Sequence, residues 1–184
     1  ALQMVNRYKE NYYVIGPYFA KQALGQFEEE PVPEICKQLY DDLKKEGIEG
    51  RYAELNKLAC RLAIEARDAS QRKILIAGSL PPLKGSFRPD LVGPSEEMKK
   101  SYQEQAELLS PYVDLFLCET MSSIAEGCAA AKVATKTGKP VWVAWTLHDD
   151  CSGRLRSGES LGEAILSLQE YNVSGFLANC CSPE

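Results

Sequence analysis

Four apolar runs, separated by segments with helical periodicity, constrain the fold of this chain more than any other feature of its sequence. Each run is continuous instead of alternating, which is typical of parallel strands buried on both faces. From Lys73 onward the pattern predicts strand, helix, strand, helix, strand, helix, strand. Consecutive parallel strands need right-handed crossovers, so we expect a parallel sheet covered by helices. The predicted strands are 74–79, 113–118, 140–147 and 175 onward. The predicted helices are 95–109, 122–137 and 160–171, and Gly138 is the expected C-cap glycine of the second.

Two architectures accommodate this order, a doubly wound sheet and a (β/α)8 barrel. No glycine-rich dinucleotide loop follows any predicted strand. Segment 77–82 does not form one, because its prolines remove amide donors. The sequence therefore favours an α/β fold of the (β/α)8 TIM barrel type, with residues 1–184 forming one partial barrel domain. A barrel of this kind needs about 250 residues. We expect early and late units to be missing and the polypeptide to be longer.

The segment before Lys73 contributes helices to this prediction. Helical spacing runs from Tyr18 to Glu30, and a charged amphipathic stretch covers 34–46. A longer helix is predicted at 52–69, where its apolar stripe indicates a core-facing side.

Composition narrows the classes of partner and compartment. The net charge is −5 without a basic stretch, which argues against nucleic acid and anionic membranes as partners. No apolar run approaches a membrane span, and the start lacks a secretory pattern. Seven cysteines without framework spacing indicate thiols in a reducing cytoplasm. The single histidine, His148, excludes a histidine-rich metal site.

Polar residues at the predicted strand ends are the candidates for chemistry. Glu119 follows a buried strand, where a carboxylate is either a site residue or a partner of a helix N-terminus. The triplet 148–150 is interpreted as a solvated loop, and Cys118 as core. Core filling or chance is the preferred interpretation for four other cysteines, namely Cys36, Cys60, Cys128 and Cys151.

The closing segment Asn179-Cys180-Cys181-Ser182-Pro183 differs from these. Pro183 cannot continue a strand ladder, so the last strand should end by Ser182, with Cys180 near its carboxyl end. A cysteine there can be a metal ligand, a nucleophile or a small hydrophobe. Side chains alternate along a strand, so only one of the two cysteines should face the site. Adjacent cysteines by themselves are a weak metal signal.

Five motifs in order carry a family resemblance that spacing alone does not. Together they resemble the homocysteine S-methyltransferase family, which includes betaine–homocysteine methyltransferase. The motifs are Ile76-Ala77-Gly78-Ser79-Leu80-Pro81-Pro82-Leu83, Asp114-Leu115-Phe116-Leu117-Cys118-Glu119-Thr120, Gly138-Lys139-Pro140-Val141-Trp142, Leu155-Arg156-Ser157-Gly158-Glu159 and Asn179-Cys180-Cys181-Ser182-Pro183.

The resemblance implies a (β/α)8 barrel that binds zinc through three cysteine thiolates and methylates homocysteine to methionine. Cys180 matches the family's first zinc ligand, and is the catalytic and metal-binding residue predicted here. Glu119 matches the residue that contacts the homocysteine amino group, and Asn179 the residue before the ligand. Asn11, in Asn11-Tyr12-Tyr13, echoes an early substrate loop. The predicted substrate-binding residues are therefore Glu119, Asn179 and Asn11.

Two family motifs are absent from the sequence. The Gly-Gly-Cys-Cys pair that supplies the other two zinc ligands is missing, as is the opening Asp-Gly-Gly loop. Cys181 adjoins the first ligand and does not match the missing pair. We expect the other two ligands to lie beyond Glu184.

The implied chemistry is methyl transfer from a cationic sulfonium, S-methylmethionine or S-adenosylmethionine, to a zinc-held thiol. A free thiol has a pKa of about 8.5, so metal coordination is needed to make it a thiolate at neutral pH. The alternative is a non-catalytic relative whose barrel serves as a binding protein. A metal-free Schiff-base lyase ranks last, because none of the four strand ends carries a lysine.

Overall fold

The computed structural model describes residues 12–15 and 51–182, which form an α/β structure with parallel strands. Two compact units make up the chain. Unit 1 comprises Ala1–Gly78 and Leu108–Asp114, and unit 2 comprises Ser79–Glu107 and Leu115–Glu184.

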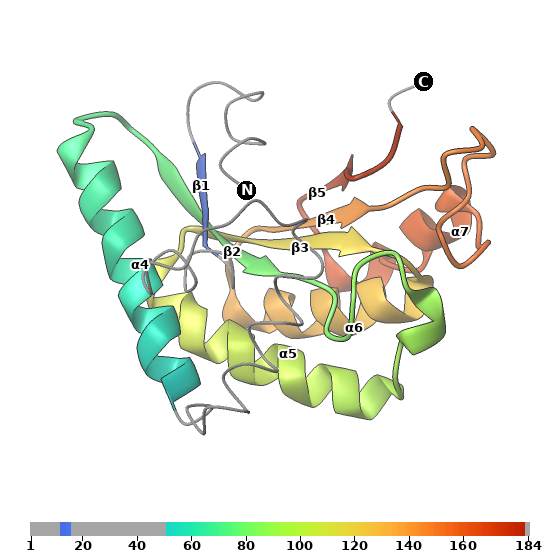
Figure 1. Ribbon diagram of the computed structural model, residues 1–184, viewed down its shortest axis with the longest axis horizontal. Helices are drawn as coiled ribbons and strands as arrows, with labels where there is room; N and C mark the ends of the chain where they lie inside the picture. Colours follow the sequence, from blue (N-terminus) through green and yellow to red (C-terminus); the bar gives the residue numbers. More distant parts are fainter. Residues whose placement is uncertain (1–11, 16–50, 183–184) are drawn as a thin grey trace, which may run out of the picture. The chain divides into compact units, whose positions relative to one another are not determined.

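In unit 1 a pair of parallel strands lies beside a long helix. Strand β1, Tyr12–Ile15, pairs with β2, Leu75–Leu80, in a register that runs from Tyr12↔Leu75 to Ile15↔Gly78. Helix α4, Tyr52–Ala69, packs on β1 and confirms the predicted bounds (Figure 1). Its predicted apolar stripe is buried only in part: Leu55 and Ala59 are buried, as is the neighbouring Cys60, whereas Leu62 is 42% exposed. The core interpretation of Cys60 is confirmed, and burial raises the pKa of this thiol to about 11.

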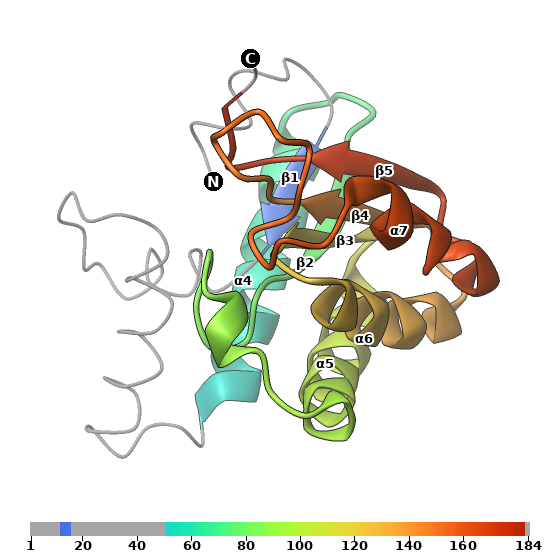
Figure 2. The same cartoon turned by 90° about the vertical axis from the view of Figure 1, so that its right-hand side faces the viewer.

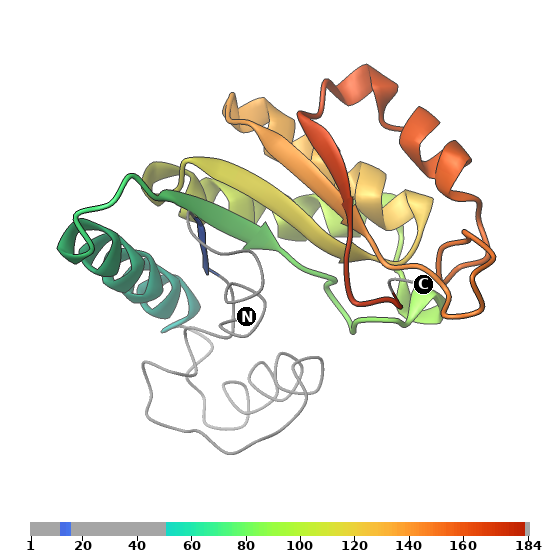
Figure 3. The same cartoon turned by 90° about the horizontal axis from the view of Figure 1, so that it is seen from above.

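Unit 2 carries three parallel strands paired in chain order. They are β3, Leu115–Met121, β4, Val141–Trp145, and β5, Gly175–Ala178. Helix α6, Ile124–Ala134, packs on β3 and β4 and contacts α7, Leu161–Leu166. Figures 2 and 3 show α6 and α7 on the same side of these strands. Helix α5 is Ser95–Leu109, as predicted. Short 3-10 helices are η2 (Pro89–Leu91), η3 (Ser110–Tyr112), η4 (Thr135–Thr137) and η5 (Gln169–Tyr171).

Local capping sets the helix boundaries in unit 2. The Ser123 side chain accepts a hydrogen bond from Glu126 N and starts α6. Ser160 and Glu163 form a reciprocal capping box that starts α7. Gly138 adopts the left-handed conformation, with a φ of 74°, after η4. This confirms its prediction as the glycine that ends the segment.

Several predicted bounds differ from the structure. Strand β4 ends at Trp145 instead of Leu147, and the helix expected at 122–137 is α6, Ile124–Ala134, followed by η4. The helix expected at 160–171 ends at Leu166 and continues only as η5, after which Asn172 adopts a left-handed φ of 50°. Strand β3 runs to Met121, past the predicted end at Cys118. An extra residue in β3 allows the pairing with β4 to resume at Met121↔Trp145.

The prediction that both faces of every strand are buried is wrong for β5. Phe176 is 37% exposed and Leu177 is 44% exposed. Within the described part of unit 2, β5 pairs only with β4. Strand β4 itself is buried apart from Trp142, whose ring occupies the space that the missing side chain of Gly175 leaves.

The core of unit 2 is tightest where α6 crosses β4. The Trp145 side chain is fully buried, and its ring lies against Gly127 of α6. A Cβ on Gly127 would lie 2.3 Å from the nearest ring carbon of Trp145.

None of the described helices is long and apolar enough to cross a membrane.

This close approach predicts a large effect of one methyl group. Gly127→Ala should lower the free energy of unfolding by about 1–3 kcal/mol, because overpacking forces Trp145 or α6 to move. Urea unfolding of the variant against the parent protein measures the change.

Gly162→Ala is the matched control. Gly162 lies in α7, where a Cβ added to it would have no heavy atom within 4 Å, so this change should be neutral or stabilising, by up to about 1 kcal/mol. Equal destabilisation by both changes would contradict the packing argument.

Candidate functional site

The carboxyl ends of β3, β4 and β5 meet along one edge of the unit 2 sheet. The register pairs Met121 with Trp145 and Trp145 with Ala178, so the residues around these positions are neighbours. The residues next to them in the chain are polar, namely Thr120, Thr146 and Asn179. In parallel α/β proteins this is the edge where sites are built.

A bulge in β3 shapes this edge. Two residues lie between Cys118 and Met121 in β3, whereas only one lies between their partners Val143 and Trp145 in β4. Thr120 lies in the bulge with a φ of 62°. A β-branched residue in this left-handed region carries strain of about 1–3 kcal/mol, and such strain is concentrated at functional sites. Bulges also redirect side chains near active sites.

Asn179, directly after β5, supports the strained bulge through both the oxygen and the nitrogen of its side-chain amide. Its Oδ1 accepts a hydrogen bond from Thr120 N at 3.1 Å, and its Nδ2 donates to Thr120 Oγ1 at 2.9 Å. Because the Thr120 oxygen accepts from Asn179, its own proton is available to a second partner. That partner is Cys180 Sγ, 3.8 Å from Thr120 Oγ1.

Cys180 follows β5 by two residues and confirms the prediction that it lies at a strand's carboxyl end. It has a left-handed φ of 53°, and its carbonyl oxygen accepts a hydrogen bond from Thr146 Oγ1 at 3.2 Å. Partial burial raises the pKa of the Cys180 thiol, the Thr120 hydroxyl opposes that rise, and the Glu119 charge adds to it. The residue as a whole is exposed, whereas Cys181 is half-buried.

Glu119 lies in the same bulge and interacts with the end of β2. Its Oε1 accepts a hydrogen bond from Ser79 Oγ, and the Ser79 carbonyl accepts one from Gln105 of α5 at 3.2 Å. Burial raises the pKa of Glu119, and the Ser79 hydrogen bond opposes the shift. A carboxyl group held in this way can bind an ammonium group or take part in proton transfer.

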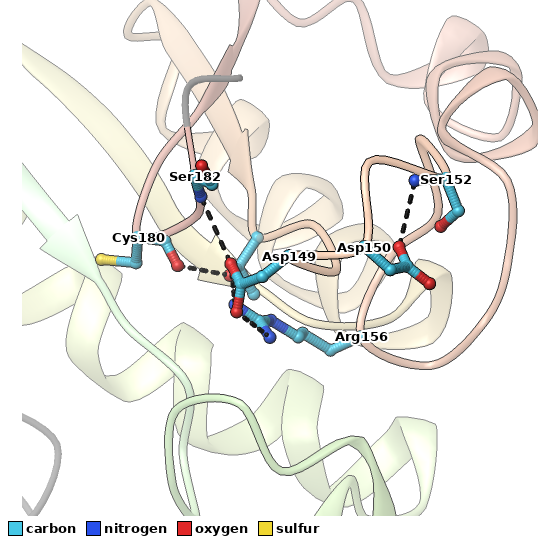
Figure 4. A network of polar contacts seen from close by, with 7 residues as sticks. Asp149, Asp150, Ser152, Arg156, Cys180 and Ser182 are labelled. Carbon is cyan, nitrogen blue, oxygen red and sulfur yellow. Dashed lines mark hydrogen bonds and ion pairs between the residues drawn. The ribbon is translucent and has the colours of Figure 1, made fainter.

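The loop after β4 is better ordered than the sequence suggested. His148 and Asp150 are exposed, as expected of a solvated loop. Asp149 differs, because Arg156 donates to both of its carboxylate oxygens, at 2.9 and 3.1 Å (Figure 4). Asp149 Oδ1 also accepts from Ser182 N at 3.3 Å. Asp149 is nevertheless exposed like its two neighbours, so the solvated-loop prediction holds for the whole triplet.

The structure brings together three of the four predicted site residues. Glu119, Asn179 and Cys180 lie around the β3 bulge, whereas Asn11 lies outside the described residues. Cys118 is fully buried, as predicted, and Cys151 lies exposed in a loop. Cys128 is half-buried, with its Sγ 3.3 Å from Ser167 Oγ, and Cys36 lies outside the described residues.

A metal fits this edge only in part. Cys180 supplies a thiol, the ligand type that zinc prefers, at an accessible strand end. Within residues 12–15 and 51–182, no group of three His, Cys, Asp or Glu side chains is arranged to hold a metal ion. A zinc site here would need further ligands from outside the described residues.

Sequence reasoning missed Thr120 and Ser79. Thr120 stood beside Glu119 in a recognised motif, but the left-handed backbone that brings its hydroxyl to Cys180 is not visible in the sequence. Ser79 ended a predicted strand and carried the same strand-end signal as Glu119.

Comparison with known proteins decides the family. The model of the family described as homocysteine S-methyltransferase matches residues 35–184. The chain belongs to this family. The resemblance stated from five motifs is thereby confirmed, and the bulge and the Cys180 segment lie inside the matched region. No curated protein matches the chain significantly.

Solved structures give the same result at the level of the fold. The chain resembles the metallated form of the homocysteine methyltransferase MmuM from Escherichia coli, with 25% identity, a TM-score of 0.62 and 97% of this chain covered. The apo form of that enzyme matches with 22% identity, a TM-score of 0.58 and the same 97% coverage. The chain spans 60% and 59% of these two relatives, respectively.

The raised pKa of Glu119 predicts a pH dependence of stability. The folded state binds the Glu119 proton more tightly than the unfolded state does. Its contribution to stability is therefore full below the unfolded pKa and is lost as the pH rises through the folded pKa. Glu119→Gln should remove this loss. As the pH rises above 5, the free energy of unfolding of the variant should therefore fall less than that of the parent protein.

Urea unfolding between pH 4 and pH 8 measures this difference. Glu97→Gln, which neutralises an exposed carboxylate of α5, is the control and should follow the parent curve. Parallel curves for Glu119→Gln and the parent would contradict the burial argument.

Proposed function

We propose that the protein is a zinc-dependent homocysteine S-methyltransferase, which transfers a methyl group from a sulfonium donor to homocysteine and yields methionine. The observation that carries this proposal is the strand-end cluster of Cys180, Thr120, Asn179 and Glu119. It places a thiol and a carboxyl group at one sheet edge of a member of the homocysteine S-methyltransferase family.

Cys180 is the proposed metal ligand from this part of the chain. The hydroxyl of Thr120 and the carbonyl contact from Thr146 hold its segment in place before a metal arrives. A catalytic zinc takes three protein ligands and keeps one position open, so two further ligands are required. When bound, zinc would acidify the substrate thiol and orient its sulfur.

Glu119 is proposed to bind the ammonium group of homocysteine. Glu119 shares the β3 bulge with Thr120, whose hydroxyl contacts Cys180 Sγ. Ser79 orients the carboxylate, and partial desolvation strengthens an ion pair formed there. Asn179 is proposed to act on the substrate indirectly, because Thr120 engages both ends of its side chain. Asn11 remains a proposed substrate-binding residue.

The methyl donor and the architecture complete the proposal. Thiolate ligands make the site negative, which favours a cationic donor such as S-methylmethionine or S-adenosylmethionine. The parallel α/β units are proposed to be part of a (β/α)8 barrel, with residues 1–184 in one domain. Exposed and half-buried thiols suit a reducing compartment such as the cytoplasm.

Paired cysteine variants test the metal assignment. Cys180→Ser should lose zinc and methyl transfer together, because a neutral hydroxyl is a poor zinc ligand. Cys181→Ser should keep most of both. Metal analysis and a methyl-transfer assay with each sulfonium donor, on protein purified under reducing conditions, measure the two effects.

The outcomes separate the alternatives. The opposite pattern would move the ligand to Cys181. Stoichiometric zinc in both variants would refute the site. Parent protein that binds no zinc and transfers no methyl group would favour a non-catalytic binding role.

Glu119→Gln tests the substrate assignment. Loss of the charge should raise the KM for homocysteine at least about tenfold, as expected for a charged hydrogen bond of about 1.5–3 kcal/mol. Zinc content should not change. Loss of zinc, or an unchanged KM, would count against an ammonium-binding role.

A further inference from the structure

The motif Leu155-Arg156-Ser157-Gly158-Glu159 is a recognised motif that the proposed chemistry does not use. It lies in the loop that follows β4, which returns on itself as a hairpin. Leu147 pairs with Leu155 in an antiparallel bridge, and His148 N donates to Arg154 O at 2.9 Å. Arg156 N donates to Thr146 O at 3.3 Å.

The second half of the motif fixes the hairpin to the start of α6. Ser157 N donates to Ser122 O at 3.0 Å. The Glu159 carboxylate accepts from Ile124 N at 2.8 Å and from Ser157 Oγ at 2.6 Å. The backbone on both sides of Arg156 is therefore hydrogen-bonded, to the end of β4 on one side and to the start of α6 on the other.

The Arg156 side chain contacts both the loop after β2 and the opposite side of its own loop. Its guanidinium carbon lies 5.2 Å from the centre of the Phe87 ring, in the loop after β2. Its two terminal nitrogens hold the Asp149 carboxylate in a bidentate pair, and its side chain is only 18% exposed. Such a fork fixes the orientation of a carboxylate, which a single charge contact does not.

Asp149 transmits this orientation to the segment that carries Cys180. Its Oδ1 accepts from Ser182 N, two residues after Cys180, and Thr146 Oγ1 donates to the Cys180 carbonyl (Figure 4). The segment 179–182 is thus held on one side by Thr120 through Asn179, and on the other by the β4 loop. Both sets of contacts restrain the segment around Cys180, which has a left-handed backbone.

We propose that Arg156 and Asp149 are positioning residues for Cys180, in which the guanidinium fork sets the Asp149 carboxylate and that carboxylate sets the backbone after β5. The chemistry given to the Cys180 thiol rests on the proposed function. The placement of the thiol rests on the contacts alone. The alternative is an ordinary exposed ion pair, which contributes little to stability and would leave Cys180 unaffected.

Graded variants of the full chain test the proposal. Arg156→Met keeps the apolar stem without the charge, Arg156→Lys keeps the charge without the fork, and Asp149→Asn removes the acceptor charge. Asp150→Asn is the matched control, since Asp150 accepts from Ser152 N in the same loop and lies apart from Cys180 and Ser182 in Figure 4.

The first readout is independent of metal and activity. Amide hydrogen exchange at Ser182, measured by NMR, should accelerate about three- to tenfold in Asp149→Asn and Arg156→Met, the range expected for loss of one ordinary hydrogen bond. Arg156→Lys should fall between these variants and the parent. The rate of iodoacetamide alkylation of Cys180, divided by the rate for the exposed Cys151 in the same protein, should change in the same order of variants. The thermal midpoint of each variant should stay within about 2 °C of the parent.

The second readout connects placement to catalysis. In the same variants kcat for methyl transfer should fall, with the KM for homocysteine unchanged. Unchanged exchange and alkylation in Arg156→Met, or equal changes in Asp150→Asn, would overturn the proposal. Parent protein without methyl transfer would refute the proposed function, while the exchange and alkylation results would still decide whether this pair positions Cys180.

Discussion

The two hydrogen bonds between Asn179 and Thr120 are the interaction on which the site depends. They join a strained bulge in β3 to the end of β5, and they bond the Thr120 amide that the bulge exposes. An unpaired amide at this position would add a desolvation cost to the backbone strain. The contact therefore stabilises the conformation that presents both Glu119 and Cys180 at the same edge.

The bulge separates structural side chains from functional ones within a single strand. Cys118, before the bulge, points into the core and is fully buried. Glu119 and Thr120, inside it, contact Ser79 at the end of β2 and Cys180 after β5. A regular strand would alternate these side chains between the two faces and bury one of them behind the sheet. One inserted residue thus makes the end of a core strand part of the candidate site.

The local parts of the fold could be predicted because their signals are local. Helices at 52–69 and 95–109 follow from apolar periodicity, and Gly138 follows from the need for a left-handed residue. Burial of β5 could not be predicted in this way. An apolar run shows only that a strand can be buried, and whether Phe176 and Leu177 are covered depends on neighbours that the run does not encode.

The sequence by itself determined the α/β class, the family and three strand-end residues, Glu119, Asn179 and Cys180, because each depends on order and adjacency along the chain. Only the tertiary structure decided how these residues work together. Thr120 meets Asn179 across 59 residues, and Asp149 meets Ser182 across 33. Such contacts arise when parallel strands pair in a particular register, and a bulge of one residue changes which side chains meet.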